Sequence, residues 1–112
     1  MRWKTRAKAP TEKRRGKKNG LEQAYARRLE QLRAAGEVLW WRFEGLSLRL
    51  ADGAHYKPDF AVQLADGTIE LHETKGHWRE AARVRIKVAA EQFPFRLLAV
   101  QLVDNHWKFE EF

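Results

Sequence analysis

Residues 56–76, YKPDFAVQLADGTIELHETKG, decide the fold of this 112-residue chain. Two runs with alternating apolar side chains, 56–64 and 68–75, stand on either side of Asp66-Gly67. Asp-Gly between such runs is a strong signal for a β-hairpin with a tight turn. The stretch therefore predicts two antiparallel strands that are neighbours in one sheet.

Charged side chains gather at the open end of this predicted hairpin. Glu73 and Lys75 continue the face of the second strand that carries Leu71, because successive side chains of a strand alternate between its faces. If the hairpin pairs tightly, Asp59 at the start of the first strand lies level with Glu73. A carboxylate and an ammonium at the end of a core-facing row are costly to bury unless they pair or bind a ligand. We therefore expect Asp59, Glu73 and Lys75 to converge.

Two converging carboxylates suit a hard cation. Mg²⁺ prefers oxygen ligands, which Asp59, Glu73 and the backbone carbonyl of Thr74 could supply. Lys75 would then position an attacking water or stabilise negative charge on a phosphorane. Each residue also has an ordinary structural interpretation: Asp59 as a strand-entry aspartate, and Glu73 with Lys75 as an exposed ion pair.

The elements around the hairpin follow from periodicity and from turn residues. The pattern predicts helices over 21–35 and 77–93, and strands over 37–43, 46–50, 56–64, 68–75, 96–103 and, at an edge, 106–109. Asn19 is the expected cap of the first helix and Gly36 its stop, and the strands at 37–43 and 46–50 are expected to pair. In the second helix Ala81, Val84 and Val88 form the expected apolar face. The fold class is α/β (α+β), in the order helix, four strands, helix, one or two strands.

The residues quoted above resemble a known superfamily motif. Pro58-Asp59, followed after a hairpin by Glu73-Thr74-Lys75 and Gly76, resembles the motif of the PD-(D/E)XK nucleases. Within this superfamily, the chain resembles small phage-encoded proteins similar to endonuclease I and Holliday junction resolvases. The resemblance covers about residues 20–101. It implies a restriction-endonuclease-like core, with a mixed sheet flanked by helices. It also implies a DNA endonuclease that uses Mg²⁺, with Mn²⁺ as a substitute, and the catalytic residues Asp59, Glu73 and Lys75.

The same resemblance implies a glutamate on the first helix that reaches the metal. Glu22 is the matching position, and at about 100° per residue it borders the apolar face of that helix. The alternative is a capping role, because Glu22 stands three residues after Asn19. The expected metal ligands are thus Asp59, Glu73, Thr74 and Glu22, with Glu22 also among the expected catalytic residues.

The composition indicates a polyanionic partner. The formal net charge is +7, and clustered lysine and arginine gain free energy by releasing counterions from phosphates. Residues 1–20 read as a flexible basic arm before a nuclease domain over 21–112. The side chains expected to contact DNA are Arg14, Arg15, Lys17 and Lys18 near the arm, and Arg79, Arg83 and Lys87 on the second helix. The basic stripe on that helix has an alternative interpretation as a solvated face.

Other residues narrow the function further. The chain has no cysteine, which excludes disulfides and thiolate chemistry, and its four histidines lack the spacing of metal ligands. We expect His72 to pack or to form hydrogen bonds, His77 to be able to touch phosphate, and the aromatic residues Trp40, Trp41, Phe43, Phe60 and Phe95 to fill the core. No segment is apolar enough to span a membrane, so a cytoplasmic location is expected, in a bacterial host if the chain is phage-encoded.

One active site per chain cuts one strand of DNA. A double-strand cut or the paired cleavage of a junction would then require a homodimer, whereas a chain acting alone would be a nickase. Two alternatives remain at this stage. The chain could be a non-catalytic module that binds nucleic acid, or a phage assembly component whose basic arm touches packaged nucleic acid.

Overall fold

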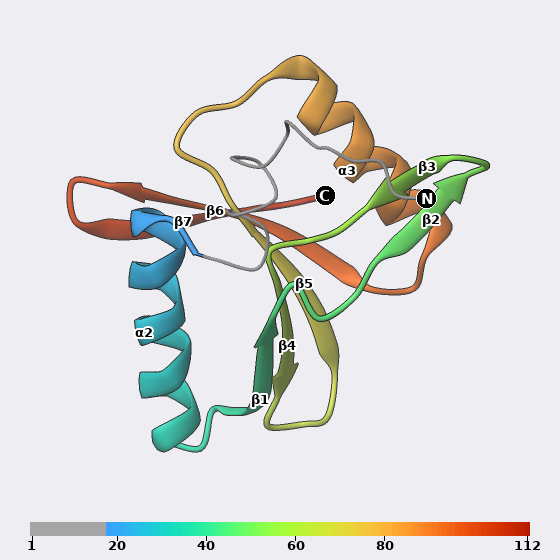
Figure 1. Cartoon of the computed structure of the whole chain (residues 1–112). Coiled ribbons are helices and arrows are strands. Elements are labelled where there is room, and N and C mark those ends of the chain that lie inside the picture. Colours follow the sequence, from blue (N-terminus) through green and yellow to red (C-terminus); the bar gives the residue numbers. More distant parts are fainter. Residues whose placement is uncertain (1–17) are drawn as a thin grey trace, which may run out of the picture.

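A mixed sheet of five strands lies at the centre of the computed structural model, which describes residues 18–112. The strand order is β1-β4-β5-β6-β7, and β5 and β6 are parallel whereas the other neighbours are antiparallel (Figure 1). The strands are β1 Val38–Phe43, β4 Phe60–Leu64, β5 Ile69–Thr74, β6 Arg96–Val103 and β7 His106–Glu111. The expected α+β fold with a mixed sheet is confirmed, and β7 lies at an edge as predicted.

Two helices cover opposite faces of this sheet. Helix α2 (Gly20–Ala34) packs against one face and helix α3 (Glu80–Gln92) against the other. Successive residues of β4 show the division, because Phe60 packs with the α2 cluster and Ala61 with the α3 cluster. The buried residues on the α2 side are Tyr25, Ala26, Leu29, Val38, Phe60, Val62 and Val100. Those on the α3 side are Leu48, Tyr56, Ala61, Leu71, Ile86, Ala89 and Leu97.

Helix α2 begins and ends one residue earlier than predicted, and Asn19 and Gly36 take the predicted roles of cap and stop. The side chain of Asn19 accepts a hydrogen bond from the backbone N–H of Glu22 at 2.8 Å. In return, Glu22 Oε1 accepts one from the backbone N–H of Asn19 at 2.9 Å. This reciprocal capping box satisfies two amides that no helical carbonyl can reach. At the other end Gly36 has φ +85°, a left-handed conformation that glycine adopts without steric cost.

The β4–β5 hairpin forms around Asp66-Gly67 as predicted. Gly67 has φ +93°, and Asp66 Oδ1 accepts a hydrogen bond from the backbone N–H of Thr68 at 2.9 Å. This turn fixes the register, in which Phe60 pairs with His72 and Val62 with Glu70. The turn therefore also determines which residues face each other at the open end of the hairpin, where Asp59, Glu73 and Lys75 lie.

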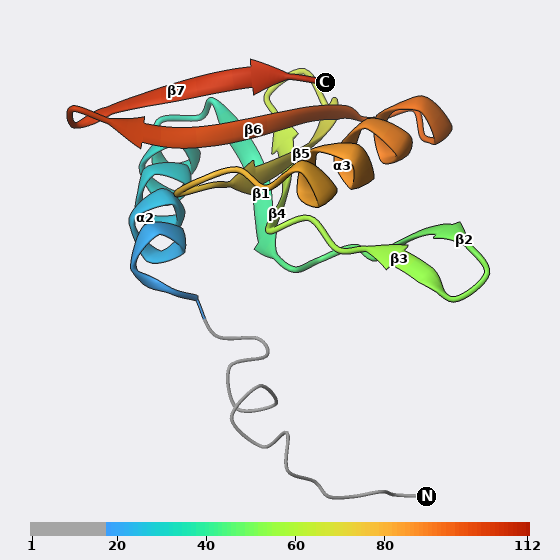
Figure 2. The same ribbon diagram turned by 90° about the horizontal axis from the view of Figure 1, so that it is seen from above.

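The pairing expected between residues 37–43 and 46–50 is wrong. Strand β2 (Leu48–Ala51) instead pairs with β3 (Ala54–Tyr56) in a separate two-stranded sheet, while β1 pairs with β4. A second Asp-Gly turn explains this, since Gly53 at φ +76° closes a local hairpin that is more easily formed than a distant pair. Figure 2 shows the β2–β3 hairpin projecting from the sheet near α3.

The run 56–64 is not one strand, so five strands precede α3 where the sequence predicted four. Tyr56 ends β3 and Phe60 begins β4, and the chain bends between them. Pro58 lies in this break and has no N–H to donate to a sheet. The break leaves Asp59 in irregular backbone at the entrance to β4.

The apolar face predicted for α3 is rotated relative to the observed face. Val84 is 48% exposed and Ala81 is exposed, whereas Ile86 and Ala89 are buried. Both sets of residues satisfy helical spacing, and the larger Ile86 side chain belongs to the set that packs. The helix also begins at Glu80, three residues later than predicted, because residues 75–79 form a loop after β5.

The expectation that all five named aromatic residues fill the core is wrong for Trp40, which is 40% exposed. The register between β1 and β4 shifts between Val38 and Trp40, so the simple alternation of faces breaks there. Phe60 is fully buried, while Trp41, Phe43 and Phe95 pack against the two core clusters. Among residues 18–112 no helix has both the length and the apolar character needed to cross a membrane.

Candidate active site

The register of the β4–β5 hairpin brings Asp59 beside Glu73, as the sequence predicted. Phe60 pairs with His72 in an antiparallel register, so Asp59, which precedes Phe60, lies opposite Glu73, which follows His72. The backbone N–H of Asp59 donates a hydrogen bond to Glu73 Oε1 at 3.2 Å. Asp59, at the entrance to β4, and Glu73, on β5, therefore lie side by side at the open end of the hairpin.

Thr74 holds the side chain of Asp59 in place. Its backbone N–H and its hydroxyl each donate a hydrogen bond to Asp59 Oδ2, both at 2.9 Å. Because Asp59 precedes the regular part of β4, its carboxylate reaches along the strand end to the residue after Glu73. The carbonyl of Thr74, the predicted ligand, belongs to this same buried residue.

Asp59 strongly favours its protonated form. Burial, and after it the charges of Glu73 and Glu22, raise the pKa of Asp59 from its ordinary 3.8 to about 8, although the hydrogen bonds from Thr74 act in the opposite direction. The effect has the expected sign, because desolvation and like charge both penalise a carboxylate. A cation bound at this carboxylate would reverse the balance and favour the ionised form.

Glu73 is fixed by three donors, of which the first is the backbone N–H of Asp59. The hydroxyl of Tyr56 also donates to Glu73 Oε1, at 2.8 Å, and Lys75 Nζ lies 3.1 Å from Glu73 Oε2. Lys75 is held through its own backbone, whose N–H donates to the carbonyl of Val100 on β6 at 2.9 Å. Its ammonium also lies 5.6 Å from the centre of the Trp78 ring. The lysine is thus fixed between the carboxylate and an aromatic face.

Glu22 takes part in the capping box described above and also lies near the site. Its charge is one of the causes of the raised pKa of Asp59, so the two carboxylates interact electrostatically. Its Oε1 atom is nevertheless occupied by the amide of Asn19. Among residues 18–112 no three His, Cys, Asp or Glu side chains come together as metal ligands. Glu73 contacts Asp59 through the backbone N–H of Asp59, whereas Glu22 is linked to Asp59 by its charge.

The side chains expected to contact DNA lie in different surroundings. On α3, Arg79 is exposed at the N-terminal cap, whereas Arg83 forms an ion pair with Glu110 at 2.6 Å. The charge of Lys87 also acts on Glu110. Lys18 lies 5.0 Å from the ring centre of Phe43. Arg14, Arg15 and Lys17 lie outside the described residues.

Three residues beside the site were not predicted from the sequence: Tyr56, Lys57 and Arg85. They line a hollow of about 130 Å³ together with Glu73 and Lys75. Tyr56 could have been suspected because it stands in the quoted stretch two residues before Pro58. Arg85 could not have been, because its position depends on which face of α3 packs against the sheet.

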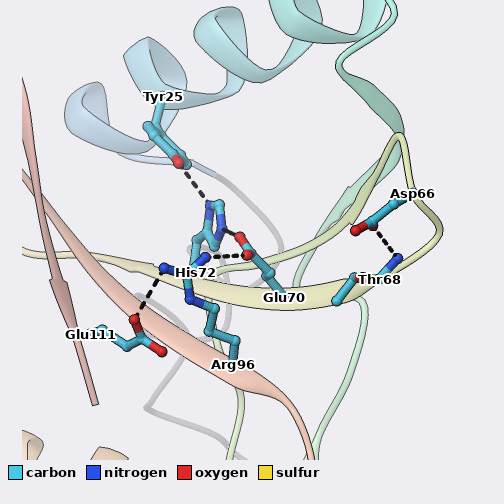
Figure 3. A network of polar contacts seen from close by, with 7 residues as sticks. All are labelled: Tyr25, Asp66, Thr68, Glu70, His72, Arg96 and Glu111. Atoms are coloured by element: carbon cyan, nitrogen blue, oxygen red, sulfur yellow. Dashed lines mark hydrogen bonds and ion pairs between the residues drawn. The ribbon is translucent and has the colours of Figure 1, made fainter.

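A separate polar network lies on the α2 face of the sheet (Figure 3). His72 Nδ1 lies 2.7 Å from the hydroxyl of Tyr25, and His72 Nε2 lies 2.9 Å from Glu70 Oε1. Arg96 extends the network by ion pairs to Glu70 at 2.8 Å and to Glu111 at 3.0 Å. The prediction that His72 forms hydrogen bonds is confirmed. Because His72 and Glu73 point to opposite faces, this network is a buried support for β5 rather than part of the site.

His77, which follows the Glu73–Gly76 segment, is exposed in the loop before α3.

Comparison of the chain with models of protein families, with curated proteins and with solved structures found no match.

Proposed function

We propose that this protein is a metal-dependent DNA endonuclease that hydrolyses phosphodiester bonds at Asp59, Glu73 and Lys75. The observation that carries the proposal is that the buried Glu73 lies beside the partly buried Asp59 and pairs with Lys75 at one end of a hairpin. Burial, and after it the charges of Glu73 and Glu22, raise the pKa of Asp59 to about 8. Perturbed pKa values cluster at functional sites, because catalytic groups need pKa values matched to their task.

The residues present fit a hard divalent cation. Thr74 occupies Asp59 Oδ2, and within residues 18–112 no hydrogen bond engages Asp59 Oδ1. Asp59, Glu73 and the Thr74 carbonyl would hold the cation. The carboxylate of Glu22 would add negative charge near the cation. When bound, Mg²⁺ or Mn²⁺ polarises the phosphoryl oxygen and lowers the pKa of a coordinated water.

The other residues act by orientation and charge. Lys75 stands beside Glu73, where its ammonium can hold an attacking water or stabilise the negative charge of the transition state. Tyr56 keeps Glu73 Oε1 turned towards Asp59 through its hydroxyl. Thr74 keeps Asp59 from rotating away. Fixed positions of this kind lower the cost of reaching a productive geometry.

The finer description of the fold belongs to this proposal. Without the β2–β3 hairpin and the edge strand β7, the order is helix, three antiparallel strands, helix and a parallel strand. The resemblance to PD-(D/E)XK nucleases implies such a mixed sheet between helices, with Asp59 and Glu73-Thr74-Lys75 on neighbouring strands. The sheet order β1-β4-β5-β6 is consistent with a restriction-endonuclease-like core.

We further propose duplex or branched DNA as the substrate, because the net charge is +7. One site per chain implies nicking by a single protomer and junction resolution by a homodimer. A cytoplasmic enzyme, in the bacterial host of a phage, agrees with this substrate.

The test is cleavage of supercoiled plasmid and of a synthetic four-way junction with Mg²⁺, with Mn²⁺ or with EDTA. Wild type is compared with Asp59→Asn and Lys75→Met, which keep the shapes of the side chains. Asp66→Asn and Lys108→Met make the same changes at exposed positions away from the site. We expect metal-dependent cutting that is lost in the first two variants and kept in the two controls.

Other outcomes point to the alternatives. DNA binding without cleavage under either metal would favour a non-catalytic nucleic-acid module. Absence of both binding and cleavage would contradict the nuclease and both alternatives, because each of the three contacts nucleic acid. Cleavage that survives Asp59→Asn and Lys75→Met would place the active site elsewhere.

A further inference from the structure

The hollow beside Glu73 is strongly basic. Lys57, Lys75 and Arg85 line it, and Glu73 is the acidic side chain among its lining residues. We call these three cations and the space between them the basic hollow. Because Lys75 already pairs with Glu73, the charges of Lys57 and Arg85 remain to be matched.

Two other arginines are paired within the protein. Arg83 pairs with Glu110, and Arg96 pairs with Glu70 and Glu111. Among the ion pairs of residues 18–112, neither Lys57 nor Arg85 takes part. A hollow lined by three cations and one carboxylate has a positive potential, and this favours an anionic ligand.

The backbone around the hollow is well supported. Arg85 immediately precedes Ile86, which is 2% exposed and anchors α3 on the sheet. Lys57 stands between Tyr56 and Pro58, and both of these are buried. The two cations therefore extend from fixed positions, so less conformational entropy is lost when they bind a ligand.

Size and charge favour a phosphate group. The volume of about 130 Å³ is large enough for a tetrahedral oxyanion, and three cations line it. A guanidinium can bind two phosphate oxygens at once, and an ammonium adds a point charge. Glu73 lines the hollow, and its Oε1 atom also accepts the backbone N–H of Asp59, so the hollow adjoins the carboxylates.

We propose that Lys57, Lys75 and Arg85 bind the phosphate of the cleaved strand that neighbours the scissile phosphate. The position of this phosphate in the reaction rests on the proposed nuclease function, whereas the phosphate site itself does not. Binding there holds the strand in line so that the scissile group meets Asp59 and Glu73. Arg85 and Lys57 are thus positioning residues that contact the substrate away from the reacting atoms.

The phosphate site is tested without catalysis. The full chain in EDTA is titrated with inorganic phosphate while backbone amide shifts are followed by nuclear magnetic resonance. We expect saturable shifts at Lys57, Lys75 and Arg85 that disappear in Arg85→Gln and persist in Arg27→Gln. Arg27 is an exposed arginine of α2 and serves as the matched control. Absence of these shifts, or equal shifts in Arg85→Gln, would overturn the proposal.

The role in cleavage is tested with a neutral methylphosphonate at the linkage beside the cleaved one. In wild type we expect kcat/KM to fall about tenfold, the usual effect of losing a charged hydrogen bond. In Arg85→Gln and Lys57→Gln the same modification has little further effect, and Arg85→Lys recovers part of the activity. Fully multiplicative effects would overturn the positioning role while leaving the nuclease intact. Phosphate shifts without cleavage under either metal would instead refute the nuclease and retain the phosphate site.

Discussion

Thr74 donates two hydrogen bonds to one oxygen of Asp59, from its backbone N–H and from its hydroxyl, each at 2.9 Å. These two hydrogen bonds join Thr74, which follows Glu73 on β5, to Asp59, which faces Glu73 across the hairpin. One carboxylate oxygen is thereby fixed, which orients the other for a ligand. The arrangement explains why a threonine in the middle of the Glu73–Lys75 segment matters to the site.

Thr74→Val removes the hydroxyl and keeps the shape and the backbone N–H. Residues that orient a metal ligand typically change metal affinity by about 10- to 100-fold. We expect the Mg²⁺ concentration for half-maximal cleavage to rise within this range. Thr68→Val makes the same change at the hairpin turn and should leave the Mg²⁺ dependence as in wild type. Equal Mg²⁺ dependence in Thr74→Val and wild type would contradict the role of the hydroxyl.

Asp59→Asn should stabilise the protein in EDTA at pH 8. Between the ordinary pKa of 3.8 and the raised value of about 8, the folded state holds a proton that the unfolded state has lost. The free energy of unfolding of wild type therefore falls as the pH rises through this window. Removing the charge should increase stability at pH 8 by roughly 1 to 3 kcal/mol, because solvent reaches part of the site.

The measurement is urea unfolding of wild type and Asp59→Asn at pH 5, 6.5 and 8. The difference between them should grow with pH. Adding Mg²⁺ at pH 8 should stabilise wild type more than the variant, because a cation favours the ionised carboxylate. A difference that is independent of pH would show that Asp59 has an ordinary pKa.

Tyr56→Phe leaves Glu73 without the hydroxyl donor that lies 2.8 Å from Oε1. Loss of one hydrogen bond to a buried carboxylate should cost about 1 to 3 kcal/mol of stability. We also expect kcat to fall, because Glu73 loses its fixed orientation towards Asp59. Single-turnover cleavage at saturating Mg²⁺ measures this effect, and Tyr25→Phe controls for the loss of a buried hydroxyl elsewhere. A variant with the kcat of wild type would show that Tyr56 is structural.

Tyr25→Phe should lower stability and leave the chemistry unchanged. The hydroxyl of Tyr25 is the partner of His72 Nδ1 at 2.7 Å, and burial raises the pKa of Tyr25 above its ordinary value. Without it a buried ring nitrogen lacks a partner, at a cost of about 1 to 2 kcal/mol. Urea unfolding and cleavage rates measured on the same preparation separate the two effects. A loss of kcat beyond the loss of folded protein would link the α2 face to the active site.

Local sequence signals predicted the elements that depend on near neighbours. The Asp66-Gly67 turn, the Asn19 cap and the Gly36 stop appear where predicted, because each is set by residues within a few positions. The proximity of Asp59 to Glu73 also followed, since a tight turn fixes the register of a hairpin. The hydrogen-bonding role of His72 was predicted without its partner Tyr25, which lies 47 positions away in the sequence.

Other features depended on competition between partners that the sequence could not rank. A second Asp-Gly turn drew β2 to β3 and left β1 to pair with β4. On α3, two apolar faces had helical spacing, and the face with Ile86 packed against the sheet. That rotation placed Arg85 beside Glu73 and brought Arg83 to Glu110.

The sequence by itself determined the hairpin, its register and the meeting of Asp59 with Glu73, because short-range turn geometry and strand alternation require them. Only the tertiary structure decided that Tyr56 supports Glu73, that Thr74 clamps Asp59 and that Arg85 lines the basic hollow. These contacts arise where separate elements dock. Docking depends on the burial of whole faces and on the pairing of charges between residues that are distant in the sequence, so a local sequence pattern cannot predict it.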